Sequence, residues 1–143
     1  MTYLLLKRFD DEDIPTILSA YNQPTISQFI SIDEENYWKY ITNTDNVYFY
    51  KVYKDNILVA TTHLELACGV LYMSVVVFPE YQKLGIATTI LNDIHVGKLG
   101  LDFHTIHVSI AENNIASRKL FESSGFVCKG KAEELLEYES CKR

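Results

Sequence analysis

The segment from Gln82 to Ala87 combines residue types that suit an anion-binding loop. It follows the apolar run "VVVF", residues 75–78, and precedes a helix-like segment. The first N–H groups of a helix have no partners inside it, and the helix dipole adds partial positive charge there, so phosphate is a natural ligand. Gly85 has no Cβ and allows close approach to the backbone, and Lys83 adds a positive charge. The pattern predicts a phosphate site where a strand leads into a helix.

Two other phosphate loops do not fit this segment. A Walker A loop requires G-x-x-x-x-G-K-[ST], a string that the sequence lacks. A dinucleotide fingerprint requires three glycines in G-x-G-x-x-G, and the segment has only Gly85. On these six residues alone, an ordinary strand-to-helix connection is an equally good interpretation.

Glu65 and His63 are the candidates for proton transfer. The β-rich runs "VYFYKVYK" and "ILVATTHLEL" flank Asp55-Asn56, which predicts a hairpin. Because strand side chains alternate, His63 and Glu65 share one face of the second strand. Histidine titrates near neutrality, so it suits proton transfer. The alternative is a solvated sheet face without function, and His104 and His107 in "FHTIHVSI" are weaker candidates.

The remaining elements give the order β-α-α-β-β-β-α-β-α-β, which indicates an α/β sheet with helices on its faces. In the N-terminal half we expect a strand over Thr2–Phe9, a helix from Pro15, a loop at "NQPTISQF" and a helix opened by a capping box at Ser31–Glu34. The apolar run "VLYMSVVVF" predicts a strand that is buried on both faces. Towards the C-terminus we expect a helix capped by Asn113 or Asn114 and ended by Gly125, and a last strand near Leu135–Tyr138.

Composition bounds the class of protein. The 143 residues favour a single domain, residues 1–143, and 48% are hydrophobic, which is enough for a core. The net charge of -6 without a basic stripe speaks against nucleic-acid binding. Three isolated cysteines favour neither disulfides nor a metal site. No apolar run approaches the ~20 residues of a membrane span, so we expect no membrane partner and a cytoplasmic location.

A second sequence motif makes the interpretation of the Gln82–Ala87 segment more specific. "NIASRKLFESSGF", residues 114–126, has the skeleton N-x-x-S-x-x-L-F-x-x-x-G-F. Together with Q-x-x-G-x-A, in this order and separated by one helix and one strand, it resembles the GNAT superfamily of acyl-CoA-dependent N-acetyltransferases. The resemblance implies a mixed β-sheet, splayed at its centre, with about four helices on its two faces. Its distinctive residues fall between about residues 75 and 126.

The resemblance also implies a cofactor site for acetyl-CoA. In this family the loop after the cleft strand holds the pyrophosphate of coenzyme A, and the strand pairs its main chain with the pantetheine arm. The residues carried over are Val75, Val76, Val77, Gln82, Lys83, Leu84, Gly85, Ile86, Ala87, Thr88, Asn114 and Phe121. Asn114 can equally serve as a helix N-cap.

The chain departs from the family pattern where acid–base groups are expected. Phe121 stands where many members have the tyrosine that acts as general acid, and "YMSVVVF" carries no carboxylate. The resemblance implies direct transfer of acetyl from acetyl-CoA to a primary amine of a small molecule or peptide, with Glu65 and His63 as the best remaining base. The two departures keep open a non-catalytic acyl-CoA-binding or regulatory module. Dimers are common in the family, so a homodimer is an option.

Overall fold

Left-handed turn residues connect the central strands in the computed structural model, which describes residues 1–141. Strands β2 (Val47–Lys54) and β3 (Ile57–Ala67) are antiparallel, and both residues of the turn between them, Asp55 and Asn56, have positive φ. That is the conformation of a two-residue type I′ turn, so the predicted hairpin is confirmed. A second antiparallel pair follows, between β3 and β4 (Val70–Val77).

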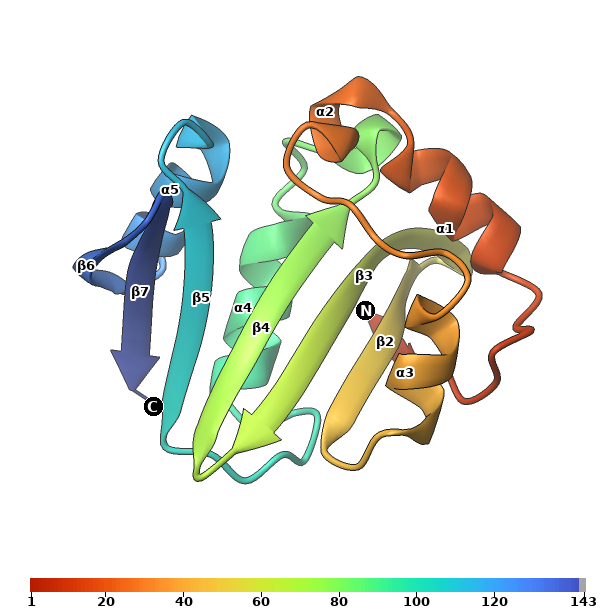
Figure 1. Cartoon of the computed structure of the whole chain (residues 1–143), viewed down its shortest axis with the longest axis horizontal. Coiled ribbons are helices and arrows are strands. Elements are labelled where there is room, and N and C mark those ends of the chain that lie inside the picture. The colour runs from red at the N-terminus through yellow and green to blue at the C-terminus, as the bar shows by residue number, and fades with distance from the viewer. Residues whose placement is uncertain (142–143) are drawn as a thin grey trace.

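Within residues 1–141, seven strands form one sheet in the order β1-β2-β3-β4-β5-β7-β6. The remaining strands are β1 (Thr2–Leu5), β5 (Thr105–Ala111), β6 (Val127–Ala132) and β7 (Leu135–Cys141). Only β4 and β5 run parallel, and they pair over three residues alone, Val70–Tyr72 with Thr105–His107. Beyond that point the two strands diverge into a V that splits the sheet at its centre (Figure 1). The expected splay is therefore confirmed.

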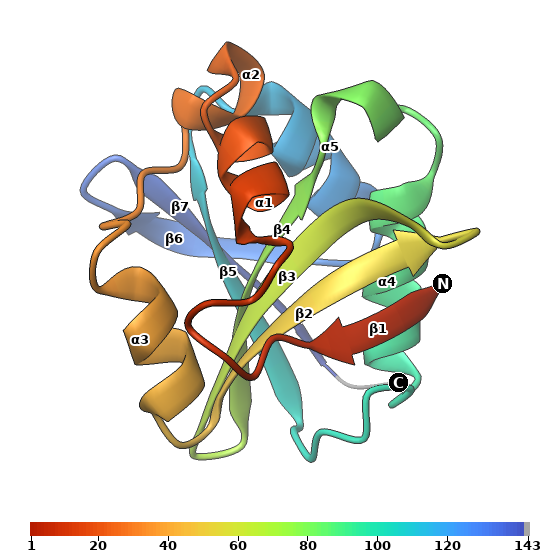
Figure 2. The same ribbon diagram turned by 90° about the vertical axis from the view of Figure 1, so that its right-hand side faces the viewer.

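Helices cover both faces of the sheet (Figure 2). One face carries α1 (Ile14–Tyr21), α2 (Pro24–Ser27) and α3 (Tyr37–Asn43), and the other carries α4 (Ile86–His95) and α5 (Ile115–Ser123). A 3₁₀ turn, η1 (Pro79–Tyr81), connects β4 to the loop before α4. None of the helices among residues 1–141 is long and apolar enough to span a membrane.

Each helical layer has its own hydrophobic core. The α4/α5 layer buries residues from the inward rows of β3, β4 and β5, including Leu64, Leu71 and Ile106, all at 0% exposure. The α1–α3 layer packs on Phe49 and Val76 on the opposite face. On the α4/α5 side the core continues across the split in the sheet, because Ile90 of α4 and residues of α5 belong to one hydrophobic cluster. The two half-sheets are thus held together by side chains behind the V.

Two details of the N-terminal half differ from the prediction. The segment expected as a loop contains the one-turn helix α2, because Pro24 occupies the first helical position and Ile26 is buried. No capping box forms before α3, which begins at Tyr37. The Asp33 carboxylate instead accepts hydrogen bonds from the Glu35 N–H and the Asn36 side chain, which shapes a turn ahead of the helix. The described part of the chain, residues 1–141, therefore has five α-helices, compared with the expected number of about four.

The prediction that β4 is buried on both faces is wrong. Tyr72 and Ser74 are exposed, whereas Leu71 and Met73 are buried. The exposed pair faces the side where α1–α3 cover only part of the sheet, so an apolar sequence does not guarantee cover. At the C-terminal end, the sequence predicted only the last strand. The strand that pairs with it, β6, has no buried residue. Because no face of β6 is buried, its sequence shows no alternation of apolar and polar residues that would predict a strand.

Candidate active site

The N-terminus of α4 lies beside the C-terminal end of β4, at the wide end of the V (Figure 1). The first bond of the helix ladder runs from the Thr89 N–H to the Gly85 carbonyl, at 3.1 Å. The N–H groups of Ile86, Ala87 and Thr88 precede that bond and so have no helical acceptor. Among residues 1–141 no backbone bond occupies them. These three donors and the dipole make the mouth of α4 suitable for an anion.

Two observations favour glycine at position 85. Its φ is +78°, in the left-handed region that L residues with side chains rarely adopt. A Cβ added there would meet no atom of the chain within 4 Å, so the space beside Gly85 is free for a ligand. Lys83 also has positive φ, and Leu84 is 62% exposed. Gln82 instead turns back, because its side-chain amide donates to the Val77 carbonyl at 3.0 Å and fixes the loop to the end of β4.

Val75, Val76 and Val77 lie on the part of β4 that has left β5. Their main chains face β3 on one side, in register with Thr62, Thr61 and Ala60. On the other side β5 has diverged, so apart from the Val77 carbonyl, which accepts from Gln82, this edge is open to a ligand that carries amides. The pantetheine arm of coenzyme A has such amides. The expected residues thus line a feature that fits the cofactor.

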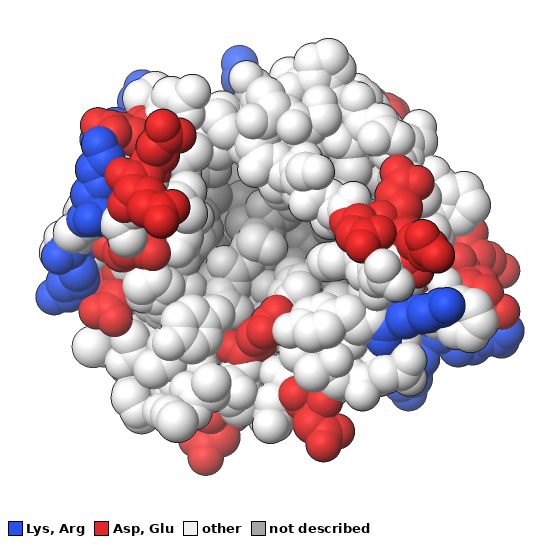
Figure 3. Space-filling view, in the orientation of Figure 1, with Lys and Arg blue, Asp and Glu red and all other residues white. Residues whose placement is uncertain are grey.

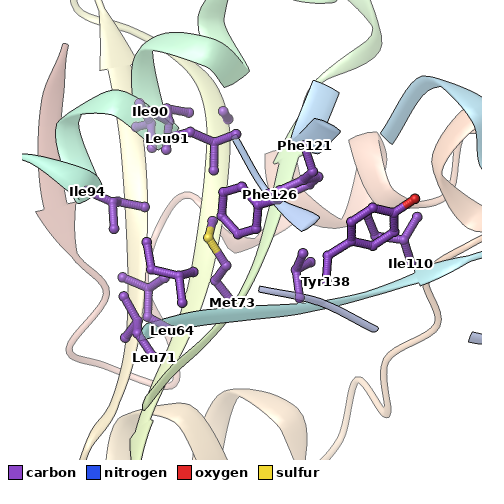
Figure 4. Packing of buried hydrophobic residues seen from close by; sticks show 14 of the residues in the cluster. Leu64, Leu71, Met73, Ile90, Leu91, Ile94, Ile110, Phe121, Phe126 and Tyr138 are labelled. Carbon is purple, nitrogen blue, oxygen red and sulfur yellow. The ribbon is translucent and has the colours of Figure 1, made fainter. Parts of the chain in front are cut away.

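The second helix mouth at the V belongs to α5. Asn114 is its N-cap, and its side-chain oxygen accepts from the Ser117 N–H at 3.3 Å. Gly125 ends the helix with φ +91°, while the Phe126 N–H bonds the Phe121 carbonyl. The Phe121 ring is 3% exposed and packs edge-on against Phe126 in the core (Figure 4). Its side chain supports α5, and its expected contact with the cofactor stays a prediction.

Three tyrosine hydroxyls from the helices meet three polar side chains of β3. Tyr21 of α1 bonds Thr61 at 2.6 Å. Two residues along, Tyr37 of α3 bonds Nδ1 of His63 at 2.5 Å, and Tyr40 donates to Glu65 at 3.0 Å. Nε2 of His63 lies 2.7 Å from the other oxygen of Glu65. His63 and Glu65 thus form a pair, as their shared strand face predicted.

The position of this pair is set by strand register. His63 lies opposite Ser74 of β4, and Glu65 lies opposite Tyr72. Tyr72 is in turn the last residue of β4 that pairs with β5, where it is level with His107. The pair therefore lies one strand away from the apex of the V, about 4.8 Å across.

Burial affects the acid–base character of the tyrosines. Burial, and then the nearby Tyr21, Glu65 and Tyr40, raises the pKa of the Tyr37 phenol above its ordinary value. Burial and the hydrogen bond to Glu65 raise the pKa of Tyr40 in the same direction. Both phenols therefore remain protonated at neutral pH. The side chain of His63 is 17% exposed and that of Glu65 is 40% exposed, so the carboxylate is open to an incoming ligand.

The sheet face around the V is hollowed, with acidic side chains on its rim and lysines and arginines towards the periphery (Figure 3). On the β5 side of the apex, His107 lies between two carboxylates, Glu137 at 3.5 Å and Glu139 at 3.8 Å. Ser109 donates to Glu137 at 2.7 Å. An ammonium group would meet favourable charge on both sides of the apex.

His104 lies at the opposite end of the sheet. Its ring packs against Gly69 in the β3–β4 turn, so tightly that a Cβ on Gly69 would clash at 2.4 Å. Its Nδ1 bonds Thr105 at 3.0 Å. The structure therefore does not bring His104 to the wide end of the V. Among residues 1–141, no group of three or more histidine, cysteine, aspartate or glutamate side chains could hold a metal ion.

The sequence gives Tyr37 and Tyr40 no role in proton transfer. The acidic and aromatic residues of the segment Tyr21–Tyr40 favour a capped amphipathic surface helix, with a wall of the acceptor site as the alternative, and Asp33, Glu34 and Glu35 are exposed in the structure. The spacing of three residues between Tyr37 and Tyr40 places both hydroxyls on one helix face, as the sequence could have shown. Which strand that face meets depends on tertiary packing.

Comparison with known proteins decides the family. The sequence model described as "Acetyltransferase (GNAT) domain" matches residues 3–127. The chain belongs to the GNAT acetyltransferase family. The matched region of this GNAT domain contains both helix mouths and β3, whereas Glu137 and Glu139 on β7 lie beyond it. No curated protein sequence matches the chain.

Solved structures share the GNAT fold over nearly the whole chain. The spermidine N-acetyltransferase of Vibrio cholerae, in complex with CoA and spermine, is 22% identical over 99% of this chain and 95% of that chain, with a TM-score of 0.77. The N-acetyltransferase PseH of Campylobacter jejuni, in complex with acetyl coenzyme A, is 11% identical over 99% of both chains, with a TM-score of 0.80. At these identities the likeness shows the fold alone.

Proposed function

We propose that the chain transfers the acetyl group of acetyl-CoA directly to a primary amine held in the same complex. The observation that carries the proposal is the V between β4 and β5, which has an open strand edge at its side and the mouth of α4 at its wide end. Those two features fit the amides and the phosphates of coenzyme A, respectively. Bound acetyl-CoA would supply an activated acyl group.

The residues of the chain would divide this work. Backbone N–H groups of Gly85 to Thr88 would hold the pyrophosphate, and Lys83 would add charge. Residues 75–77 would bind the arm through their main chains. An alkylammonium has a pKa near ~10.4, so it must lose a proton before it can attack an acyl group. Glu65 and His63 would provide the acceptor for that proton, one strand away from the apex.

The hollow with carboxylates on both sides favours a cationic acceptor. Glu65 stands on the β3 side, and Glu137 and Glu139 stand on the β5 side. Small polyamines therefore belong in any panel of acceptors. The Vibrio cholerae structure is a spermidine N-acetyltransferase in complex with spermine, and both compounds are polyamines.

A second candidate function is a non-catalytic acyl-CoA-binding module. It is favoured by the burial of Phe121, which can donate no proton, and by the exposed face of β4, which offers Tyr72 and Ser74 but no carboxylate. The enzyme hypothesis does not require the proton donor, because a thiol with a pKa near ~8.5 is a fair leaving group. It does not require a carboxylate on β4 either, because Glu65 and His63 are the proposed base.

One experiment separates the two functions. Isothermal titration would measure binding of acetyl-CoA, and a thiol-release assay would measure turnover over a panel of small amines, polyamines and peptides. A bound ligand at 100 times its Kd adds about 2.7 kcal/mol of stability, so a thermal shift gives a second measure of binding. Binding with thiol release supports the enzyme, binding without release on any amine supports the module, and no binding refutes both.

A further inference from the structure

The ring of His63 has both nitrogens occupied. Nε2 lies 2.7 Å from a carboxylate oxygen of Glu65, and Nδ1 lies 2.5 Å from the hydroxyl of Tyr37. An ionised carboxylate can only accept hydrogen bonds, so Nε2 must carry the hydrogen of the neutral ring. Nδ1 then has the lone pair, and the Tyr37 hydroxyl must be the donor to it. No lone pair of the ring is left for direct contact with an acceptor amine.

A proton can therefore reach the ring only through one of its two partners. The carboxylate end is already the acceptor of the Nε2 hydrogen. The Tyr37 hydroxyl, by contrast, can donate and accept at the same time. It can receive a proton on its oxygen while it passes its own proton to Nδ1. The two partners of the ring, Glu65 and Tyr37, lie on the same side of β3. On that side α3 packs against the strand and brings Tyr37 to His63 and Tyr40 to Glu65.

We propose that Tyr37 is a catalytic residue that passes the proton of the acceptor ammonium to His63, while Glu65 holds the resulting imidazolium. The N–H bond of the ammonium breaks as its proton joins the Tyr37 oxygen, and the Tyr37 proton moves to Nδ1. The amine becomes neutral, Tyr37 ends as a neutral phenol, and the positive charge rests on His63 beside the Glu65 carboxylate. This step rests on the acetyltransferase function proposed above.

The surroundings of His63 contain few competing titratable groups. Glu65 is on its own strand, and Tyr37 and Tyr40 reach it from α3. Its cross-strand neighbours in register are Phe49 of β2 and Ser74 of β4, neither of which titrates near neutrality. The hydroxyl of Tyr21 is engaged with Thr61.

The test compares two matched variants of the full chain. Tyr37→Phe removes the proposed shuttle and keeps the ring that packs edge-on against Trp38 and Phe49. Tyr40→Phe makes the same change three residues along α3, at a hydroxyl that contacts Glu65 only. With the best amine of the panel, kcat of Tyr37→Phe should fall by about 100-fold or more, with unchanged Kd for acetyl-CoA. The loss for Tyr40→Phe should stay below about tenfold.

A fluorinated analogue of that amine, uncharged at the assay pH, provides the decisive readout. It has no ammonium proton to lose, so the Tyr37→Phe defect should shrink below about tenfold. An equal loss with both amines would show a merely structural role and overturn the proposal, as would equal kcat values for the two tyrosine variants. If the wild type binds acetyl-CoA but acetylates no amine, the proposed function fails and the proposal fails with it.

The tautomer of His63 gives a readout that needs no acceptor. Long-range ¹H–¹⁵N NMR of the histidine-labelled protein, assigned with His63→Gln, should show the neutral ring protonated at Nε2 in the wild type. A neutral ring protonated at Nδ1 would overturn the proposal even if the protein acetylates amines.

Discussion

Replacement of Gly85 by valine tests the anion site at the mouth of α4. Gly85 has φ +78°, and a Cβ there would enter space that no atom of the chain occupies within 4 Å. The added isopropyl group would fill the volume that a phosphate needs in order to reach the backbone donors. Loss of two hydrogen bonds to a charged group, at ~1.5–3 kcal/mol each, predicts at least about 3 kcal/mol, or more than 100-fold weaker binding of coenzyme A.

Gly97 provides a matched control for backbone strain. Its φ is +79°, a Cβ there also meets nothing within 4 Å, and it follows the C-terminal end of α4. A side chain in the left-handed region costs ~1–2 kcal/mol at either position. Gly85→Val and Gly97→Val should therefore unfold at similar urea concentrations, both below the wild type. Only Gly85→Val should lose affinity for coenzyme A in isothermal titration.

Two results would refute this reasoning. Unchanged affinity of Gly85→Val would show that no phosphate approaches the backbone there. Equal loss of affinity in both glycine variants would trace the effect to the stability of α4 rather than to the ligand space. Lys83→Ala completes the series. The lysine adds an exposed charge to a site made of backbone donors, so its loss should weaken binding by less than about tenfold, or ~1.4 kcal/mol.

Three further predictions concern catalysis, capping and acid stability. Glu65→Gln keeps a hydrogen-bond acceptor for His63 but removes the charge, so kcat should fall by about 100-fold; an unchanged kcat/KM and pH profile would exclude Glu65 from proton transfer. Asn114→Ala removes the N-cap of α5 and should lower the free energy of unfolding by ~1 kcal/mol, whereas Asn114→Ser keeps a capping oxygen and should restore that stability. If the serine variant is stable but still binds acetyl-CoA weakly, Asn114 has a second role beside the cofactor. The hydrogen bond from Tyr53 is the largest cause that lowers the pKa of the Asp13 carboxyl. Its contribution to stability is fully present above about pH 4 and is lost as pH falls through the folded pKa. In urea unfolding, Tyr53→Phe should therefore destabilise most at pH 7 and progressively less as pH falls below about 4, and a loss that does not change with pH would contradict the assignment.

The sequence determined the features that depend on neighbouring residues. Asp55-Asn56 predicted a hairpin because those residue types tolerate positive φ. Gly85 before a helix-like segment predicted the start of α4, and Gly125 before Phe126 predicted the end of α5, because helix termini impose local rules on backbone donors and acceptors. Alternation along β3 placed His63 and Glu65 on one face.

Only the tertiary structure decided which side chains from different helices and strands lie next to each other. Pairing between β4 and β5 stops after Tyr72, which opens the edge of β4. The helices α1–α3 cover only part of one sheet face, which leaves Tyr72 and Ser74 exposed on a strand of apolar sequence. The packing of α3 over β3 brings the hydroxyl of Tyr37 to His63, across 26 residues of sequence. Such contacts depend on how whole layers pack, and periodicity describes only one element at a time.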